Sequence, residues 1–129
     1  MSRLAFLLLS ALLALPAQAA PQPDPVCFLP GRHFDSAFLG NWEIAQWKVR
    51  YSLFMRDRQV CLLARDMQAD EWFEIPEIQW DGQFLRAGFL LRSTKWRTDS
   101  QLSLASGDRL RDEYTWRDGR RIDYWTRRK

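Results

Sequence analysis

The sequence predicts a mainly β protein, a small antiparallel up-and-down barrel or sandwich of about eight strands. Three observations predict this fold class. Short apolar and aromatic runs follow one another along the chain, separated by turn residues at intervals of roughly 8–12 residues. Several of these runs alternate apolar and polar side chains, as half-buried strands do. A hairpin signal, Asp118-Gly119, lies between the last two runs.

An α+β fold, with one helix packed on an antiparallel meander, is the alternative. Residues 57–72 carry Val60, Leu63, Met67 and Glu71 at helical spacing, so this segment fits a helix as well as a strand. The chain also has only three Val and four Ile, so its β signal depends on aromatic and leucine side chains.

The chain begins with a segment typical of an export signal. Arg3 precedes an apolar run over residues 4–15, and Ala17-Gln18-Ala19 places small side chains where a leader peptidase requires them. We therefore expect residues 1–19 to be a signal peptide cleaved after Ala19, and the protein to be periplasmic or secreted. The apolar run would span about 18 Å as a helix, short of the ~30 Å hydrocarbon core, so we expect no membrane-spanning segment.

Residues 20–30 are predicted to form a proline-rich extended tail. Four prolines lie in this short stretch, and each one fixes φ and lacks an amide donor. Residues 31–129 follow as a single β-rich domain, because this length is typical of one domain.

Cys27 and Cys61 are the two cysteines of the chain. They lack C-x-x-C spacing, and His33 is the single histidine, so a metal or redox site has too few ligands. In an oxidising compartment such a pair indicates a structural disulfide. We therefore predict a Cys27–Cys61 bond, and we expect no metal ion and no cofactor.

The strands of the domain are predicted from its apolar runs. In chain order these are residues 42–44, 47–53, 60–63, 73–75, 78–80, 84–91, 96–98 and 102–104. The alternation changes phase between the first two, which predicts a bulge or bend near Ala45-Gln46. Pro76 suits an edge or a break, since proline cannot donate to a strand ladder. Asp81-Gly82 predicts a hairpin before Phe84.

The C-terminal hairpin is the clearest element. Leu110, Tyr114 and Trp116 lie on one face of its first strand, and the chain returns through Ile122 and Tyr124. A three-residue loop over residues 117–119 would pair Tyr114 with Ile122 and keep the apolar faces together. We therefore predict that register.

Seven tryptophans are the most unusual feature of the composition. They are Trp42, Trp47, Trp72, Trp80, Trp96, Trp116 and Trp125. Large aromatic side chains can fill a small core, and they can also line a cavity or a binding patch. Trp72 and Trp125 are the two that we expect outside the core, and they are the candidate aromatic binding residues.

Arginines near the C-terminus form a second candidate binding set. Removing the leader takes away Arg3 and leaves 18 Lys and Arg against 16 Asp and Glu, a net charge of +2. The alternate face of the last hairpin carries Arg109, Arg111, Arg117 and Arg121. A solvated face with cross-strand ion pairs is the simpler interpretation. A functional face would meet an anionic envelope component or an acidic protein surface, and export argues against nucleic acid.

No sequence motif indicates catalysis: the chain has no hydrolase elbow, phosphate-binding glycine loop or zinc spacing. Paired carboxylates could perform general acid–base chemistry if they met in a cleft. The candidate pairs are Asp70-Glu71, Glu74 with Glu77, and Asp112-Glu113 opposite Asp123. We expect no enzyme and assign no catalytic residue.

The stretch that contains Gly40-Asn41-Trp42 resembles the G-x-W opening of lipocalin-like (calycin-type) barrels. Such barrels place an arginine of the last strand over that tryptophan, and the resemblance implies this position for Arg121 or Arg127. Exported relatives of this size include inhibitors of secreted metalloproteases, whose N-terminal tail enters the protease cleft. The proline-rich tail of residues 20–30 is compatible with that arrangement.

Together these features predict an exported bacterial envelope protein that is non-catalytic and binds, or inhibits, another protein. The alternative function is that of a carrier for a small apolar ligand in a tryptophan-lined cavity. A second alternative is a cell-envelope hydrolase that uses one of the carboxylate pairs.

Overall fold

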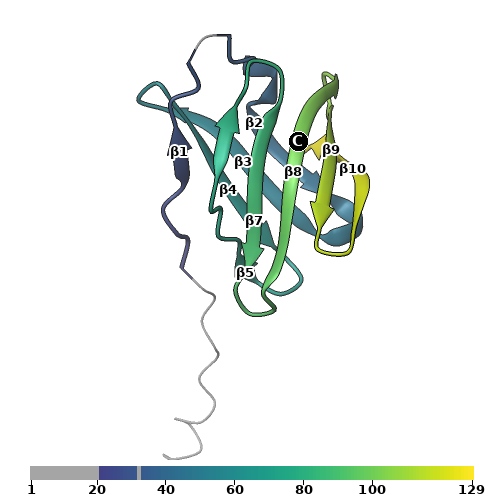
Figure 1. The fold of residues 1–129 in the computed structure, drawn as a ribbon. Helices are drawn as coiled ribbons and strands as arrows, with labels where there is room; N and C mark the ends of the chain where they lie inside the picture. Colours follow the sequence, from purple (N-terminus) through teal and green to yellow (C-terminus); the bar gives the residue numbers. More distant parts are fainter. Residues whose placement is uncertain (1–20, 32) are drawn as a thin grey trace, which may run out of the picture.

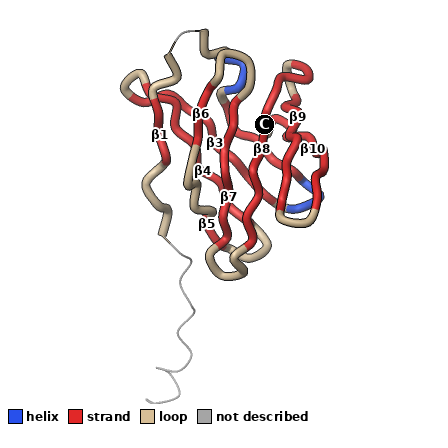
Figure 2. Tube along the Cα trace, in the orientation of Figure 1, coloured by secondary structure: helices blue, strands red, loops and turns tan. Residues whose placement is uncertain are grey.

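Ten antiparallel strands form a nearly closed barrel in the part of the chain that the structure, a computed structural model, describes: residues 21–31 and 33–129. Figure 1 labels the strands, and Figure 2 shows that strands dominate the chain. The strands are β1 (Val26–Phe28), β2 (Gly40–Ile44), β3 (Val49–Arg56), β4 (Gln59–Asp66), β5 (Glu71–Trp72), β6 (Ile78–Trp80), β7 (Leu85–Leu91), β8 (Trp96–Ser106), β9 (Arg109–Trp116) and β10 (Gly119–Arg127). The predicted small antiparallel barrel is confirmed, with more strands than expected. The predicted signal peptide lies outside the described residues.

The α+β alternative is wrong, because residues 57–72 contain β4 and β5 instead of a helix. Val60, Leu62 and Ala64 are buried at every second position, which is the period of a strand. Each of the two helical segments, η1 (Ser36–Phe38) and η2 (Ala45–Trp47), is one short 3₁₀ turn. No helix in residues 21–31 and 33–129 is long and apolar enough to cross a membrane.

The sheet runs in the order β1-β4-β3-β2-β10-β9-β8-β7-β6. The segment around β5 joins β4 to β7, the strands next to the two ends of this order. On one side the Phe73 amide donates to the Ala64 carbonyl of β4, at 2.9 Å. On the other side Glu74 and Leu90 of β7 exchange two backbone hydrogen bonds of 2.8 Å. Pro76 lies just after this bridge, where the ladder is already interrupted.

Three predicted local features differ from the structure. Trp47 belongs to η2 and not to a strand, and the phase change at Ala45-Gln46 is a full chain reversal between the paired strands β2 and β3. Lys48 completes that turn in the left-handed region, with φ 54°. The two predicted pieces at residues 96–98 and 102–104 are one strand, β8, with a register shift between Leu104 and Ser106.

The predicted register of the last hairpin is wrong. Tyr114 pairs with Arg121 and not with Ile122, because the loop contains only Arg117 and Asp118. The pairing of Leu110 with Trp125 therefore turns Trp125 into the barrel, where it is fully buried. Ile122 is 44 % exposed on the outer face. The prediction that Trp125 lies outside the core is wrong for the same reason, since a one-residue slip reverses every side chain of a strand.

The disulfide between Cys27 and Cys61 is confirmed. The two residues lie directly opposite each other where β1 pairs with β4, so the bond ties the N-terminal strand to the barrel. Disulfides persist in oxidising compartments, so this bond is consistent with an extracytoplasmic location.

We expect a Cys27→Ala/Cys61→Ala variant to lose about 3–4 kcal/mol of unfolding free energy, because the bond closes a loop with a sequence separation of 34 residues. Urea unfolding of the oxidised wild type and the variant measures this loss. Wild-type protein reduced with dithiothreitol is the matched control and should unfold at the same urea concentration as the variant. Equal stability of oxidised and reduced protein would contradict the prediction.

Candidate functional site

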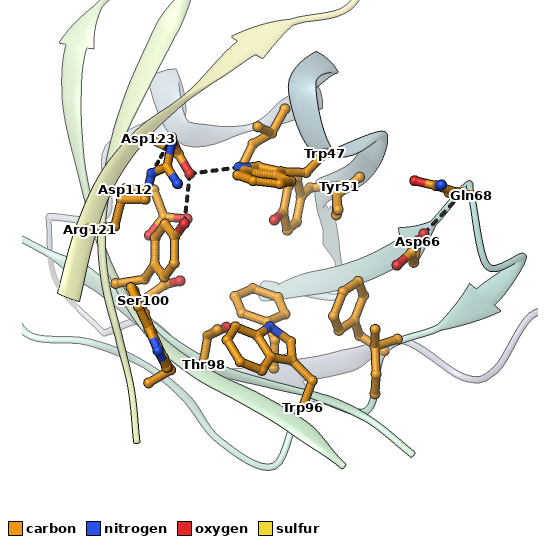
Figure 3. Close-up of a pocket in the computed structure, with 17 residues that line it drawn as sticks. Trp47, Tyr51, Asp66, Gln68, Trp96, Thr98, Ser100, Asp112, Arg121 and Asp123 are labelled. Atoms are coloured by element: carbon orange, nitrogen blue, oxygen red, sulfur yellow. Dashed lines mark hydrogen bonds and ion pairs between the residues drawn. The ribbon is translucent and has the colours of Figure 1, made fainter. Parts of the chain in front are cut away.

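A cavity of about 470 Å³ lies inside the barrel, near the end formed by η2 and the turns that connect β7 to β8 and β9 to β10. Figure 3 shows its walls, with Trp47 and Asp123 facing Trp96 and Thr98 across the space. Trp47 and Trp96 are 43 % and 45 % exposed, so the cavity reaches the surface beside them. A volume of this size lies within the usual range for small-molecule sites, about 300–1,000 Å³.

The opposite end of the barrel is filled by side chains. Trp42 is fully buried there, and its indole Nε1 donates to the Phe38 carbonyl at 3.0 Å. The Arg127 guanidinium lies 4.2 Å from the centroid of the Trp42 ring. It also donates to the carbonyls of Leu39, at 2.9 Å, and Ala37, at 3.1 Å. A side chain at Gly40, whose φ is +142°, would overlap this guanidinium, so position 40 requires glycine.

The walls of the cavity are mainly aromatic. Seven aromatic side chains line it: Trp47, Tyr51, Phe73, Phe89, Trp96, Tyr114 and Trp116. Tyr51 stacks on the buried Trp125, with 3.6 Å between ring centroids, and meets Phe89 edge to face at 5.6 Å. These contacts hold the deep wall in one arrangement, while Trp96 and Trp116 pack against each other farther out. The cavity therefore offers broad, fixed apolar faces.

Asp123 connects the polar groups on one side of the cavity. Its Oδ2 accepts from the Trp47 indole at 3.0 Å and from the Tyr114 hydroxyl at 2.8 Å. Its Oδ1 lies 3.7 Å from Nε of Arg121. Figure 3 shows these contacts as dashed lines. Burial and the hydrogen bond to Asp123 raise the pKa of Tyr114 to about 12, so this hydroxyl stays a donor and Asp123 keeps all its partners.

Asp112 is the second acid of the cavity, and it is only 2 % exposed. Its Oδ2 accepts from the Trp125 indole at 2.9 Å. Its Oδ1 is buried and has no hydrogen-bond partner among the described residues. Burial raises the pKa of the Asp112 carboxyl to about 7. Hydrogen bonding by the Trp125 indole and the Ser100 hydroxyl acts in the opposite direction, and the charge of Asp123 adds to the increase. An unpartnered buried carboxyl oxygen is costly, and it needs a donor.

The predicted arginine face is divided by the true hairpin register. Arg121 turns into the cavity, with its guanidinium 5.2 Å from the centroid of the Trp47 ring. Arg109 lies on the outer face, 4.0 Å from the centroid of the Tyr124 ring, and Arg111 pairs there with Glu113 at 3.2 Å. Arg117 lies in the turn. The four side chains therefore do not form one cationic surface.

The two candidate tryptophans occupy different positions. Trp72 is half-buried on β5, with the Arg65 guanidinium 5.2 Å from its ring centroid, and it does not line the cavity. Trp125 lies behind the cavity wall, where it supports Tyr51 and holds Asp112. Trp125 would therefore contribute to a site by positioning Tyr51 and Asp112.

Of the predicted carboxylate pairs, Asp112 and Asp123 lie opposite each other on β9 and β10 and both line the cavity. The other acids are engaged elsewhere. Asp70 pairs with Arg65, Glu71 accepts from Ser93, Glu74 pairs with Arg92, Glu77 pairs with Arg97, and Glu113 pairs with Arg111 and Arg120. In residues 21–31 and 33–129 no three potential ligands cluster to hold a metal ion. Hydrolase activity stays a prediction.

Asp112 was predicted only as a member of a carboxylate pair, and its place on the apolar face of its strand was missed. It lies between Leu110 and Tyr114, so strand alternation places it on the same face as both. An acid at an inward position of an otherwise apolar strand face is a signal that could have found it. Trp47 gave no such signal, because its contact with Asp123 joins residues 76 positions apart.

Comparison of the chain with protein-family models, with characterised proteins and with solved structures gives no match. The resemblance of Gly40-Asn41-Trp42 to the opening of lipocalin-like barrels therefore stays a resemblance. Binding of a protein partner or of an anionic envelope component stays a prediction as well.

Proposed function

We propose that this protein is a non-catalytic carrier that binds a small, largely apolar molecule in the aromatic cavity of its barrel. The observation that carries the proposal is the cavity of about 470 Å³ with seven aromatic side chains in its walls. Ligand sites in proteins are typically concave and mostly apolar, with a few convergent polar groups. Asp112, Asp123 and Arg121 are such groups here.

The contacts of Asp123 favour binding over catalysis. Asp123 is engaged by Trp47, Tyr114 and Arg121, and Asp112 holds the Trp125 indole through one oxygen. A general acid or base must exchange its proton with a reacting group within hydrogen-bond distance. Three fixed partners leave Asp123 poorly placed for that exchange, whereas they orient it well to shape a binding site.

The carrier is proposed to work outside the cytosol. The leader pattern of residues 1–19 supports export with cleavage after Ala19, and the Cys27–Cys61 bond is consistent with an oxidising compartment. N-terminal sequencing of the processed protein tests the cleavage site.

Titration with N-phenyl-1-naphthylamine, a neutral dye whose emission rises in apolar surroundings, tests the carrier function. We expect saturable binding to the wild type. Trp96→Ala removes one half-exposed wall of the cavity and should weaken binding about five- to tenfold, because it deletes apolar area that the dye would cover.

Tyr124→Ala is the matched control, because Tyr124 is an aromatic residue of similar exposure on the outer face of β10. It should leave the dye affinity unchanged. Equal weakening by both substitutions, or no saturable binding to the wild type, would overturn the proposed function.

A further inference from the structure

The inference concerns the kind of molecule that the cavity accepts, and it rests on the proposed carrier function. Its starting point is Oδ1 of Asp112, which is buried in the cavity wall and forms no hydrogen bond of good geometry with the residues that the structure describes. The nearby Ser100 hydroxyl lowers the pKa of the Asp112 carboxyl but does not complete such a bond to Oδ1. Leaving such an atom unpaired is costly, and more so when it is charged. Such a group needs an explanation, and a ligand that supplies the missing partner is one.

Charge in the cavity favours a positive partner. The charged residues of its lining are Asp66, Asp112 and Asp123 against the single guanidinium of Arg121. Arg121 is already placed between Asp123 and the Trp47 ring. Asp66 accepts from the backbone amides of Gln68 and Ala69 in its own turn, at 2.9 and 3.0 Å. Asp112 is the acid of this lining whose unpaired oxygen is buried among the described residues, and no cation pairs with it there.

Aromatic walls add a second reason for a positive partner. The faces of tryptophan and tyrosine rings carry negative electrostatic potential and attract organic cations. Tyr51, Tyr114 and Trp116 line the same cavity as Asp112. A ring system in the ligand would pack on these walls. A neutral donor could pair with the Asp112 oxygen but would add no positive charge, and a carboxylate could not donate to it at all.

We infer that the cavity binds an aromatic or apolar amine in its protonated form, with an ammonium N–H donated to Oδ1 of Asp112. The nitrogen carries at least one hydrogen, since a quaternary ammonium could not supply the missing donor. The apolar body of the ligand lies between the aromatic walls. Asp112 is the residue that selects the amine, and Trp125 positions it.

Calorimetric titration of the oxidised protein with three probes of one shape tests this inference: 1-naphthylmethylamine, 1-naphthylmethanol and 1-naphthoate. The experiment is done at pH 8, above the pKa of about 7 of the Asp112 carboxyl. We expect the amine to bind at least about tenfold more tightly than the alcohol, because both can donate to the Asp112 carboxylate but only the ammonium adds a positive charge to that hydrogen bond. The naphthoate should bind most weakly.

Two variants separate a direct contact from the general charge of the cavity. Asp112→Asn should reduce the preference for the amine over the alcohol to about threefold or less. Asp66→Asn removes the same formal charge from the lining but no buried unpaired oxygen, so it should keep the preference. Thermal unfolding of both variants shows that they are folded, and the affinity for the alcohol serves as an internal reference for the cavity.

The outcomes distinguish this inference from the proposed function. Equal binding of amine and alcohol to the wild type, or tightest binding of the naphthoate, overturns the inferred selectivity for an amine but not the proposed carrier function. Equal loss of preference in both variants overturns the contact with Asp112. Absence of binding by all three probes overturns the inference together with the carrier function on which it rests.

Discussion

Replacing Trp42 by alanine is expected to lower the free energy of unfolding by about 4–5 kcal/mol, near the upper end of the cost of removing a buried tryptophan. Trp42 is fully buried, donates to the Phe38 carbonyl at 3.0 Å and lies under the Arg127 guanidinium. Its loss leaves a large void at the filled end of the barrel, and Arg127 loses the ring on which it packs. Small domains are stable by about 5–15 kcal/mol, so much of the variant could unfold under mild conditions.

Trp96→Ala is the matched control for this prediction. It deletes the same side chain from a position that is 45 % exposed, so we expect a loss of about 1 kcal/mol or less. Urea unfolding of the two variants and the wild type, followed by circular dichroism, measures the difference. Similar losses in both variants would mean that Trp42 does not fill this end of the barrel as tightly as its burial indicates.

The second large effect is a dependence of stability on pH that originates at Asp112. In the folded protein the pKa of this carboxyl is about 7, against an ordinary value of 3.8. Between these values the folded state keeps a proton that the unfolded state releases, so stability falls as pH rises, by about 1.4 kcal/mol per pH unit. The stabilisation is complete below pH 3.8, is lost as pH rises to about 7 and changes no further above it.

Asp112→Asn should remove this dependence. We expect the stability of the variant relative to the wild type to increase by about 4 kcal/mol between pH 4 and pH 8. Comparing the two proteins cancels the contributions of acids that both share, such as Glu71, Asp81 and Glu113, whose pKa values hydrogen bonds lower. The measurement is the urea midpoint and slope at several pH values.

Asp118→Asn, in the exposed turn before β10, controls for the simple loss of one negative charge. Its stability relative to the wild type should change by about 0.5 kcal/mol or less over the same pH range. If the difference in unfolding free energy between Asp112→Asn and the wild type did not change with pH, the Asp112 carboxyl would not be held neutral in the folded barrel.

Local patterns in the sequence predicted much of the fold. Val49, Tyr51 and Leu53 are buried on alternate positions of β3, as the period of two requires. Asp81-Gly82 forms the predicted hairpin, in which the Asp81 carboxylate accepts from the amides of Gln83 and Phe84. These features depend on residues close in sequence, so the pattern carries the information that determines them.

Features that depend on longer contacts were predicted less well. The helix alternative for residues 57–72 failed because the pairing of β4 with β1 and β3 overrides local helical spacing. The three-residue loop predicted for the last hairpin was chosen from its apolar side chains alone and was wrong, because the true loop contains only Arg117 and Asp118. The true register buries Trp125 with its indole on Asp112 and exposes Ile122, a choice that tertiary packing makes.

The sequence by itself determined most of the strand pattern, the mainly β antiparallel class and the Cys27–Cys61 pair, because period, turn residues and cysteine count are local or compositional properties. Only the tertiary structure decided which side chains share the cavity. Trp47, Asp112 and Asp123 come from η2, β9 and β10, and the register of β9 with β10 brings them together. The physical reason is that a barrel interior is assembled from alternate residues of distant strands, so one residue of register decides which groups face the ligand.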